Sequence, residues 1–294
     1  MTELFDGYEF ALCLTHDVDR PYKTFQAPYY AVKESDPSHL RSLLTDERPY
    51  WQFDEVMALE EEFGVRSSFY FLNEKRLFRD KGPRDWVNPE SWKLFTGRYR
   101  VDDDEIADVI RRLDRGGWEI GLHGSYESYD DRERLRREKA VLERVLGDDV
   151  IGGRQHYLRL DRPTTWKHQR AIGLRYDATL GSNDGYGFDG RYDVIRPFDD
   201  AFVAFPLTVM ERPHVESADT IDEAWRECRR LLVEADENDA IMTVLWHPLY
   251  FNDDEFPGYT DIYERMIETA AEMGAWIGAC GECYDHLEAT RPVR

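Results

Sequence analysis

The sequence contains little lysine and has a large deficit of positive charge. Seven of its 294 residues are lysine, and the formal net charge is −22. No basic stripe is available to neutralise phosphates, which argues against nucleic acid as a main partner and against docking on anionic lipid. An acid-rich, lysine-poor surface is typical of adaptation to high salt, because carboxylates keep the protein hydrated and dispersed.

Long hydrophobic runs are also missing. No stretch approaches the roughly 20 apolar residues of a membrane span, so we expect no membrane insertion. Residues 1–14, MTELFDGYEFALCL, have neither the basic start nor the cleavable apolar segment of a signal peptide. We therefore expect a cytoplasmic protein. The sequence does not indicate its oligomeric state.

Cysteine is scarce, and one common glycine pattern is absent. The four cysteines are Cys13, Cys228, Cys280 and Cys283, and the last two have redox or zinc spacing without a second pair to complete a zinc site. We interpret them as small apolar residues and expect no structural disulfide. No G-x-G-x-x-G follows the first apolar stretch, which argues against a dinucleotide-binding fold.

Strand and helix patterns alternate along the chain. They predict strands at 10–15, 65–72, 118–123, 150–159, 174–180, 201–209, 240–247 and 275–280, and helices at 51–64, 102–117, 131–147, 164–173, 220–235, 259–274 and 281–290. Repeated β–α units favour a parallel sheet, closed or nearly closed into a barrel, with an open doubly wound sheet as the alternative. Residues 22–50 and 73–102 read as long loops, whose length suggests binding or lid roles.

Polar side chains stand at the ends of several predicted strands. The carboxyl ends of parallel strands build the active site in such folds, so side chains there are expected to converge. The residues at these ends are His16, Asp17, Asp19, His123, Arg154, His156 and His247.

Carboxylate and imidazole together suit a borderline divalent metal, and Asp19 and His123 are our first two candidate ligands. Asp17 and Asp19 point the same way on a regular strand, so one can bind a metal while the other stays free as a base. A metal nearby would keep both carboxylates ionised. Asp19, which precedes Arg-Pro-Tyr, could instead be a turn or helix-capping residue.

Four of these segments together resemble the polysaccharide deacetylase family, the metal-dependent carbohydrate N-deacetylases, over about residues 8–288. The segments are THDVD (15–19), EIGLHGSYES (119–128), RQHYLR (154–159) and LWHPL (245–249). The likeness is greatest to a subgroup with HDVD, HxSY and RQHYL segments. The resemblance implies a single α/β domain over residues 1–294, a distorted (β/α)7-type barrel with long loop insertions.

The resemblance also implies an activity and three catalytic roles. The chain would remove N-acetyl groups from amino sugars of a glycan or glycan precursor, using a divalent metal ion, with zinc as the first choice. Asp17 would be the base, Arg154 would orient Asp17, and His247 would be the acid that protonates the leaving amine.

The metal site departs from the family pattern. The family has adjacent aspartates in its first motif, whereas Val18 separates them here. The family's H-x-x-x-H also has Glu127 in place of its second His, so the third ligand beside Asp19 and His123 is open. We favour His156 over Glu127, and His16 is a weaker substitute.

Four aromatic residues near the strand ends could stack on sugar rings: Tyr126, Tyr157, Trp246 and Tyr250. Two other functions stay open. The chain could be a different metal-dependent hydrolase on the same scaffold, acting on a cyclic or other small amide. It could also be a non-catalytic glycan-binding relative, which the incomplete histidine motif keeps in consideration.

Overall fold

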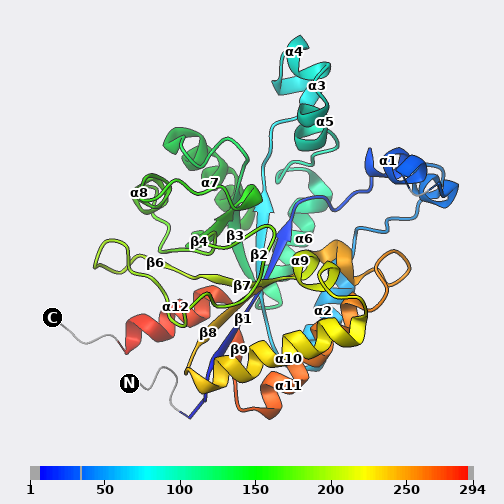
Figure 1. Ribbon diagram of the computed structural model, residues 1–294. Coiled ribbons are helices and arrows are strands. Elements are labelled where there is room, and N and C mark those ends of the chain that lie inside the picture. The colour runs from blue at the N-terminus through cyan, green and yellow to red at the C-terminus, as the bar shows by residue number, and fades with distance from the viewer. Residues whose placement is uncertain (1–6, 34, 291–294) are drawn as a thin grey trace.

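A parallel β-sheet curls around an enclosed core and carries helices on its outer surface (Figure 1). The computed structural model describes residues 7–33 and 35–290. The strands in this part of the chain are β1 (Ala11–Val18), β2 (Ser68–Leu72), β3 (Glu119–Gly124), β4 (Gly152–Gln155), β5 (Tyr176–Asp177), β6 (Val203–Ala204), β7 (Leu207–Met210), β8 (Ile241–Leu245) and β9 (Trp276–Gly278). Their order is β6-β5-β4-β3-β2-β1-β8-β7, with β9 paired to β1. This is the distorted α/β barrel that we expected, and not an open doubly wound sheet.

The larger helices follow the strands in the order predicted by the sequence. They are α2 (Phe53–Glu62), α6 (Asp104–Arg115), α7 (Arg132–Leu146), α8 (Thr164–Ala171), α10 (Ile221–Glu237), α11 (Tyr259–Glu272) and α12 (Cys280–Ala289). A short helix, α9 (Glu211–Glu216), follows β7, and η3 (Pro248–Phe251) follows β8. The helices α2, α6, α10 and α11 bury apolar stripes against the outer face of the sheet.

The two faces of β1 have different surroundings. Leu12 and Leu14 belong to the large core between the sheet and its outer helices. Ala11 and Cys13 point the other way, into a smaller core inside the curled sheet. Because side chains alternate along a strand, Asp17 continues the interior face.

The lower half of β1 has an unusual pairing. Residues Ala11–Cys13 pair with both β8 and β9, whereas Thr15–Val18 pair with β2. Since a strand has only two edges, β9 takes the place of β2 beside this half of β1. Helix α12 follows β9, and its Cys280 and Cys283 pack against Cys13 in the interior core. All four cysteines are free and buried.

The two segments read as loops contain short helices. Residues 22–50 hold α1 (Gln26–Lys33) and η1 (Pro37–Leu43), and residues 73–102 hold α3 (Leu77–Asp80), α4 (Pro83–Trp86) and α5 (Pro89–Phe95). Both stand out from the barrel at the top and right of Figure 1. Proline begins three of these helices and each is short, so no helical periodicity develops in the sequence.

Three predicted strands are shorter than expected. The strand predicted at 201–209 is divided into β6 and β7 at Phe205 and Pro206, and that predicted at 174–180 forms only two ladder positions. The strand predicted at 150–159 ends at Gln155 and turns into η2 (His156–Leu158). Tyr157 and Leu158 there have φ of 58° and 51°, which is rare for residues with side chains and is concentrated at functional sites.

No helix in the described ranges has the length and apolar character needed to cross a bilayer. The expectation that the chain has no signal peptide rests on residues 1–14, and residues 1–6 lie outside the described ranges.

Candidate metal centre and catalytic site

A cleft of about 370 Å³ opens at the carboxyl ends of the strands. Asp17, Asp19, His123, His156 and His247, which stand at the ends of four strands, all line it. The convergence expected from their positions in the sequence is therefore present in the structure.

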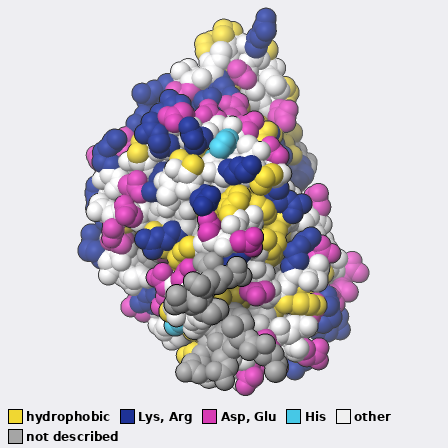
Figure 2. Space-filling model, turned by 90° about the vertical axis from the view of Figure 1, so that its left-hand side faces the viewer, with side chains coloured by type: hydrophobic (Ala, Val, Ile, Leu, Met, Phe, Trp, Pro, Cys, Tyr) yellow, Lys and Arg dark blue, Asp and Glu magenta, His cyan; other side chains and the backbone are white. Residues whose placement is uncertain are grey.

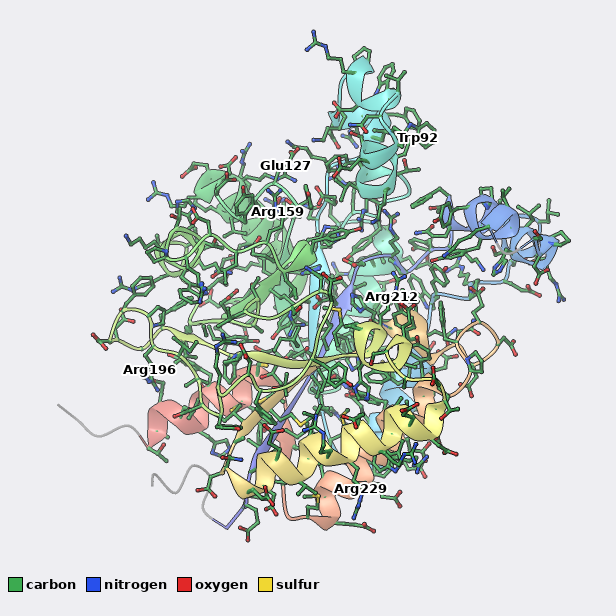
Figure 3. The ribbon with its side chains drawn as sticks, viewed as in Figure 1. Trp92, Glu127, Arg159, Arg196, Arg212 and Arg229 are labelled. Carbon is green, nitrogen blue, oxygen red and sulfur yellow. The ribbon has the colours of Figure 1, made fainter. Side chains whose placement is uncertain are left out.

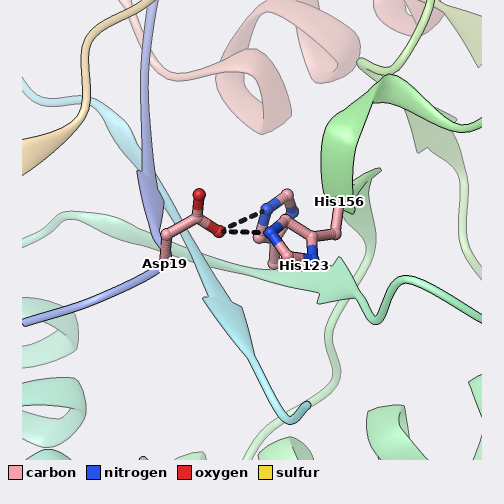
Figure 4. A group of neighbouring side chains, drawn as sticks. All are labelled: Asp19, His123 and His156. Atoms are coloured by element: carbon pink, nitrogen blue, oxygen red, sulfur yellow. Dashed lines mark ion pairs between the residues drawn. The ribbon is translucent and has the colours of Figure 1, made fainter. Parts of the chain in front are cut away.

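Asp19, His123 and His156 form the candidate metal centre (Figure 4). Oδ1 of Asp19 lies 3.2 Å from Nε2 of His123 and 3.3 Å from Nε2 of His156, and the three ligand atoms lie within 4.8 Å of one another. Asp19 Oδ1 is buried and has no hydrogen-bond partner in the described chain. A carboxylate oxygen left without a donor between two imidazole nitrogens fits a divalent cation such as zinc.

The other two candidates for the third ligand lie elsewhere. Glu127 accepts hydrogen bonds from Lys75, Lys81 and Arg134, and Figure 3 shows it on the upper surface of the molecule. His16 faces the outer helices, where its Nε2 lies 2.9 Å from Oε1 of Glu60. The strand alternation that brings Asp17 and Asp19 to the interior turns His16 away from them.

Each histidine of the candidate centre has a partner on its other ring nitrogen. Nδ1 of His123 lies 2.9 Å from the backbone carbonyl of Arg154, which favours the tautomer with a free Nε2. Nδ1 of His156 lies 3.4 Å from Oε2 of Glu74. Burial and the nearby Arg98 lower the pKa of His156 to about 4, so its ring is neutral, as a metal ligand must be.

Glu74 is a buried residue that the sequence analysis did not single out. It follows β2, accepts from the backbone N–H of Tyr126 at 2.7 Å, and is paired with Arg134 at 2.9 Å. These contacts fix the carboxylate that orients His156. Such a carboxylate–histidine arrangement is common behind metal ligands.

Asp17 and Arg154 form a buried ion pair beside this centre. Nη1 of Arg154 lies 2.8 Å from Oδ1 of Asp17 and 2.9 Å from Oγ1 of Thr15, and its Nε donates to the carbonyl of Ala178. Burial alone would raise the pKa of Asp17, but the charges of Arg154, His123 and His247 together outweigh it and lower the pKa. Asp17 is therefore ionised, as a base near neutral pH must be.

His247 is paired with Glu211, a second acidic residue that the sequence analysis missed. Nδ1 of His247 lies 2.7 Å from Oε1 of Glu211, and Nε2 lies 3.6 Å from Oδ2 of Asp19. Burial opposes the imidazolium, but Glu211 and Asp19 outweigh it and raise the pKa of His247 well above its ordinary value. Glu211 directly follows β7, so its place at a strand end was a signal that could have identified it.

Three of the four aromatic candidates lie in different surroundings. Tyr157 lines the cleft and is partly exposed. Tyr126 packs behind it, with ring centroids 5.7 Å apart, and does not line the cleft. Trp246 is 0% exposed and packs against Tyr263 in the outer core, so our expectation that it stacks on a sugar is wrong.

Tyr250, the fourth aromatic candidate, lines the same cleft, and so does Arg212. Figure 3 shows Arg212 on α9, facing the space below the protruding helices. The charge of Arg212 and the ring of Tyr250 are two groups in the cleft that can contact a polar, ring-shaped ligand.

Comparisons with known proteins agree with this geometry at the level of the fold. No protein-family model and no curated protein sequence matches the chain. Solved structures do match, including a candidate polysaccharide deacetylase from Mycobacterium smegmatis, with a TM-score of 0.62, 18% identity, and coverage of 98% of this chain and 96% of that one.

Two further matches have TM-scores of 0.61. One is a candidate polysaccharide deacetylase from Pseudomonas aeruginosa, at 13% identity over 98% of this chain and 94% of that one. The other is the Puue allantoinase, at 14% identity over 98% and 93%. At such low identities the likenesses establish a shared fold.

Proposed function

We propose that this protein belongs to the polysaccharide deacetylase family and removes N-acetyl groups from amino sugars of a glycan or glycan precursor. The observation that carries the proposal is the arrangement of three groups around one cleft. These are the Asp19–His123–His156 cluster, the Asp17–Arg154 pair and the His247–Glu211 pair. A ligand set, a base and an acid in one cleft are the parts that metal-assisted amide hydrolysis needs.

The base step depends on Asp17. A divalent cation held by Asp19, His123 and His156, zinc first among the candidates, would supply Lewis acidity toward the acetamide carbonyl and the attacking water. Asp17 takes a proton from that water, and Arg154 keeps the carboxylate charged and oriented. Arg154 is buried on all sides, so its position is set by the barrel and not by the substrate.

The acid step depends on His247. The carbon–nitrogen bond breaks when the departing amine gains a proton, and Nε2 of His247 faces the same space as the Asp19 carboxylate. Glu211 holds the imidazole through Nδ1 and favours its protonated form. The two carboxylates therefore divide the work, because Asp17 accepts a proton while Glu211 keeps one available on His247.

The test is acetate release from N-acetylated oligosaccharides by the purified, metal-loaded protein. We expect turnover that Asp17→Asn abolishes while the variant stays folded and retains metal. Asp102→Asn, an exposed aspartate on a surface turn, is the control and should keep full activity. Absence of turnover with a broad panel of acetylated amino sugars, by protein shown to hold one metal ion, would contradict the proposal.

A second candidate is hydrolysis of a cyclic amide, supported by the match to an allantoinase over nearly the whole chain. The same base, acid and metal ligands would serve, so the substrate distinguishes the two. Turnover of small cyclic amides without turnover of acetylated sugars would favour the second candidate. A non-catalytic glycan-binding protein would instead bind its ligand equally well after Asp17→Asn and show no turnover at all.

A further inference from the structure

The exposed large apolar side chains of the described residues gather on the two protrusions beside the cleft. On the α3–α5 lobe, residues 73–98, they are Phe78, Trp86, Val87 and Trp92, and on the α1–η1 protrusion they are Tyr29, Val32, Leu43 and Leu44. The remainder of the described chain exposes Tyr8, Tyr157 and Val233. Apolar surface concentrated in this way on a protein with a polar exterior marks a contact site.

The aromatic side chains at the tip of the α3–α5 lobe can be removed from water without leaving a polar group unpaired. The ring of Phe78 lies against Trp92 and Trp86, with centroids 5.3 Å and 6.1 Å apart. Both indole N–H groups already donate to backbone carbonyls, that of Trp86 to Leu77 at 3.0 Å and that of Trp92 to Trp86 at 2.7 Å. When an apolar ligand covers these rings, both indole N–H groups therefore keep their hydrogen-bond partners.

The composition of the tip favours lipid over sugar. The side chain of Val87 is 83% exposed, and that of Val32 on the other protrusion is 82% exposed. An aliphatic side chain presents no ring on which a sugar can stack, whereas acyl chains accept aliphatic and aromatic side chains alike. Tryptophan next to basic side chains is also the composition found where proteins contact the membrane interface.

The outward charge of the tip is positive. Arg79, Arg84 and Lys93 are exposed and form no ion pair within the described chain. The carboxylates of Asp80 and Asp85 instead accept hydrogen bonds inside the lobe. Figure 2 shows basic and hydrophobic side chains together at the top of the molecule, where this tip lies. The lobe thus complements an anionic surface.

The net charge of the whole chain does not oppose such a contact. Charges are screened over about 10 Å at 0.1 M salt, so attraction is decided by the residues nearest the surface. The excess of acid lies in the remainder of the molecule, since residues 73–98 hold seven Lys or Arg and four Asp or Glu. Our expectation from composition alone does not take this local reversal into account.

We propose that the α3–α5 lobe seats the protein on an anionic membrane surface. The lobe borders the cleft, because Nζ of Lys93 lies 5.6 Å from the ring centre of Tyr157 and Arg98 donates to the carbonyl of Asp19. A seated lobe therefore brings the cleft close to the headgroups. If the proposed function holds, on which this last step rests, the substrate is an acetamido sugar carried by a membrane lipid.

The test of docking needs no catalysis. The full-length protein is sedimented with vesicles of phosphatidylcholine alone and with vesicles that also contain phosphatidylglycerol, at low and high salt. We expect binding to the anionic vesicles only, weaker at high salt. Arg79→Glu/Arg84→Glu should bind at least about tenfold more weakly, since each basic residue near such a surface contributes roughly fivefold. Trp86→Ser/Val87→Ser should also bind at least about tenfold more weakly, because it removes apolar surface that would enter the interface.

Matched controls are Val233→Ser and Arg229→Glu, both exposed on α10, which lies at the end of the molecule away from the lobe (Figure 3), and both should bind as the parent does. Circular dichroism shows that each variant is folded. Docking is overturned if the parent protein stays unbound, if the lobe variants bind like the controls, or if Trp86→Ser/Val87→Ser instead disperses a dimer or lowers binding of a soluble glycan.

The substrate step has its own readout. Trp86→Ser/Val87→Ser should lower turnover of a vesicle-borne acetamido sugar and leave turnover of a soluble one unchanged. Equal loss on both substrates overturns this step. Vesicle binding without turnover of either substrate would contradict the proposed function and leave the docking surface standing.

Discussion

Nη1 of Arg154 lies 2.8 Å from Oδ1 of Asp17, and neither side chain has appreciable contact with solvent. The two residues are 137 positions apart in the chain, and β4 and β1 bring them together across the interior of the curled sheet. This pair links the stability of the barrel to the charge of the proposed base.

Removing Arg154 should therefore destabilise the fold as well as stop catalysis. We expect Arg154→Ala to lower the free energy of unfolding by about 3–5 kcal/mol, because it leaves a buried carboxylate without its partner. Denaturant titration measures this. Arg136→Ala, which breaks an exposed pair with Glu133, should cost less than about 1 kcal/mol. Equal costs for the two variants would show that the buried pair has no special role.

Metal analysis of purified variants should identify the third ligand. His156→Ala and His123→Ala should each lose most of their bound metal, whereas Glu127→Gln should retain it, because Glu127 is engaged with Lys75, Lys81 and Arg134. Elemental analysis after dialysis measures the metal content. Retention by His156→Ala together with loss by Glu127→Gln would reverse this assignment.

Glu74 should affect metal affinity through His156. We expect Glu74→Gln to weaken metal binding about 10–100-fold, as is common when a carboxylate behind a ligand is lost. Competition with a chromophoric chelator measures the affinity. Glu138→Gln is the control, since Glu138 also pairs with Arg134 but does not contact His156. A similar loss in both variants would trace the effect to Arg134 rather than to the histidine.

The His247–Glu211 pair should set the alkaline limb of the pH–rate profile. As an acid, His247 must carry its proton, so activity should fall as the pH rises through its elevated pKa. Glu211→Gln removes the negative charge that favours the imidazolium, so the alkaline limb should move to lower pH. The profile of kcat/KM measures this, with Glu216→Gln on the exposed end of α9 as control. An unmoved limb in Glu211→Gln would assign the limb to another group.

Tyr157 and Trp246 should behave in opposite ways. Trp246→Ala should cost about 3–5 kcal/mol of unfolding free energy, because it removes a large buried ring from the core. Tyr157→Ala, at the partly exposed wall of the cleft, should leave stability nearly unchanged and raise KM for the glycan. Thermal unfolding and steady-state kinetics separate the two effects, and a normal KM in Tyr157→Ala would remove Tyr157 from the binding site.

Strand alternation accounts for both the success and the failure of the sequence analysis near the site. It placed Asp17 and Asp19 on one face, because β1 is regular up to Val18. Applied to β8, the same alternation separates Trp246 from His247, and it would have sent the tryptophan to the outer core. The fold class could be predicted because most of the buried strands are followed by an amphipathic helix, although none separates β5, β6 and β7.

Glu74 and Glu211 stand just after strands, which makes them candidates, but that position alone does not show that they contact a histidine. The chain contains 60 acidic residues, so acidity alone distinguishes no position. What sets these two apart is burial against a histidine, and that burial depends on how β2 lies relative to β4 and β7 relative to β8. The helices of the two protrusions were missed for a local reason, since each is too short to show a repeating apolar stripe.

The alternation of side chains along β1 also restricts which insertions and deletions this strand can accept in evolution. Loss or gain of one residue between Ala11 and Thr15 would rotate everything beyond it by half a turn. The imidazole now held against Glu60 would then occupy the place of a carboxylate in the cleft, and Asp17 would be driven among the rings of Phe53 and Phe69. Insertions and deletions in this part of β1 are tolerable only two residues at a time. The protruding segments that follow β1 and β2 can instead lengthen by single residues.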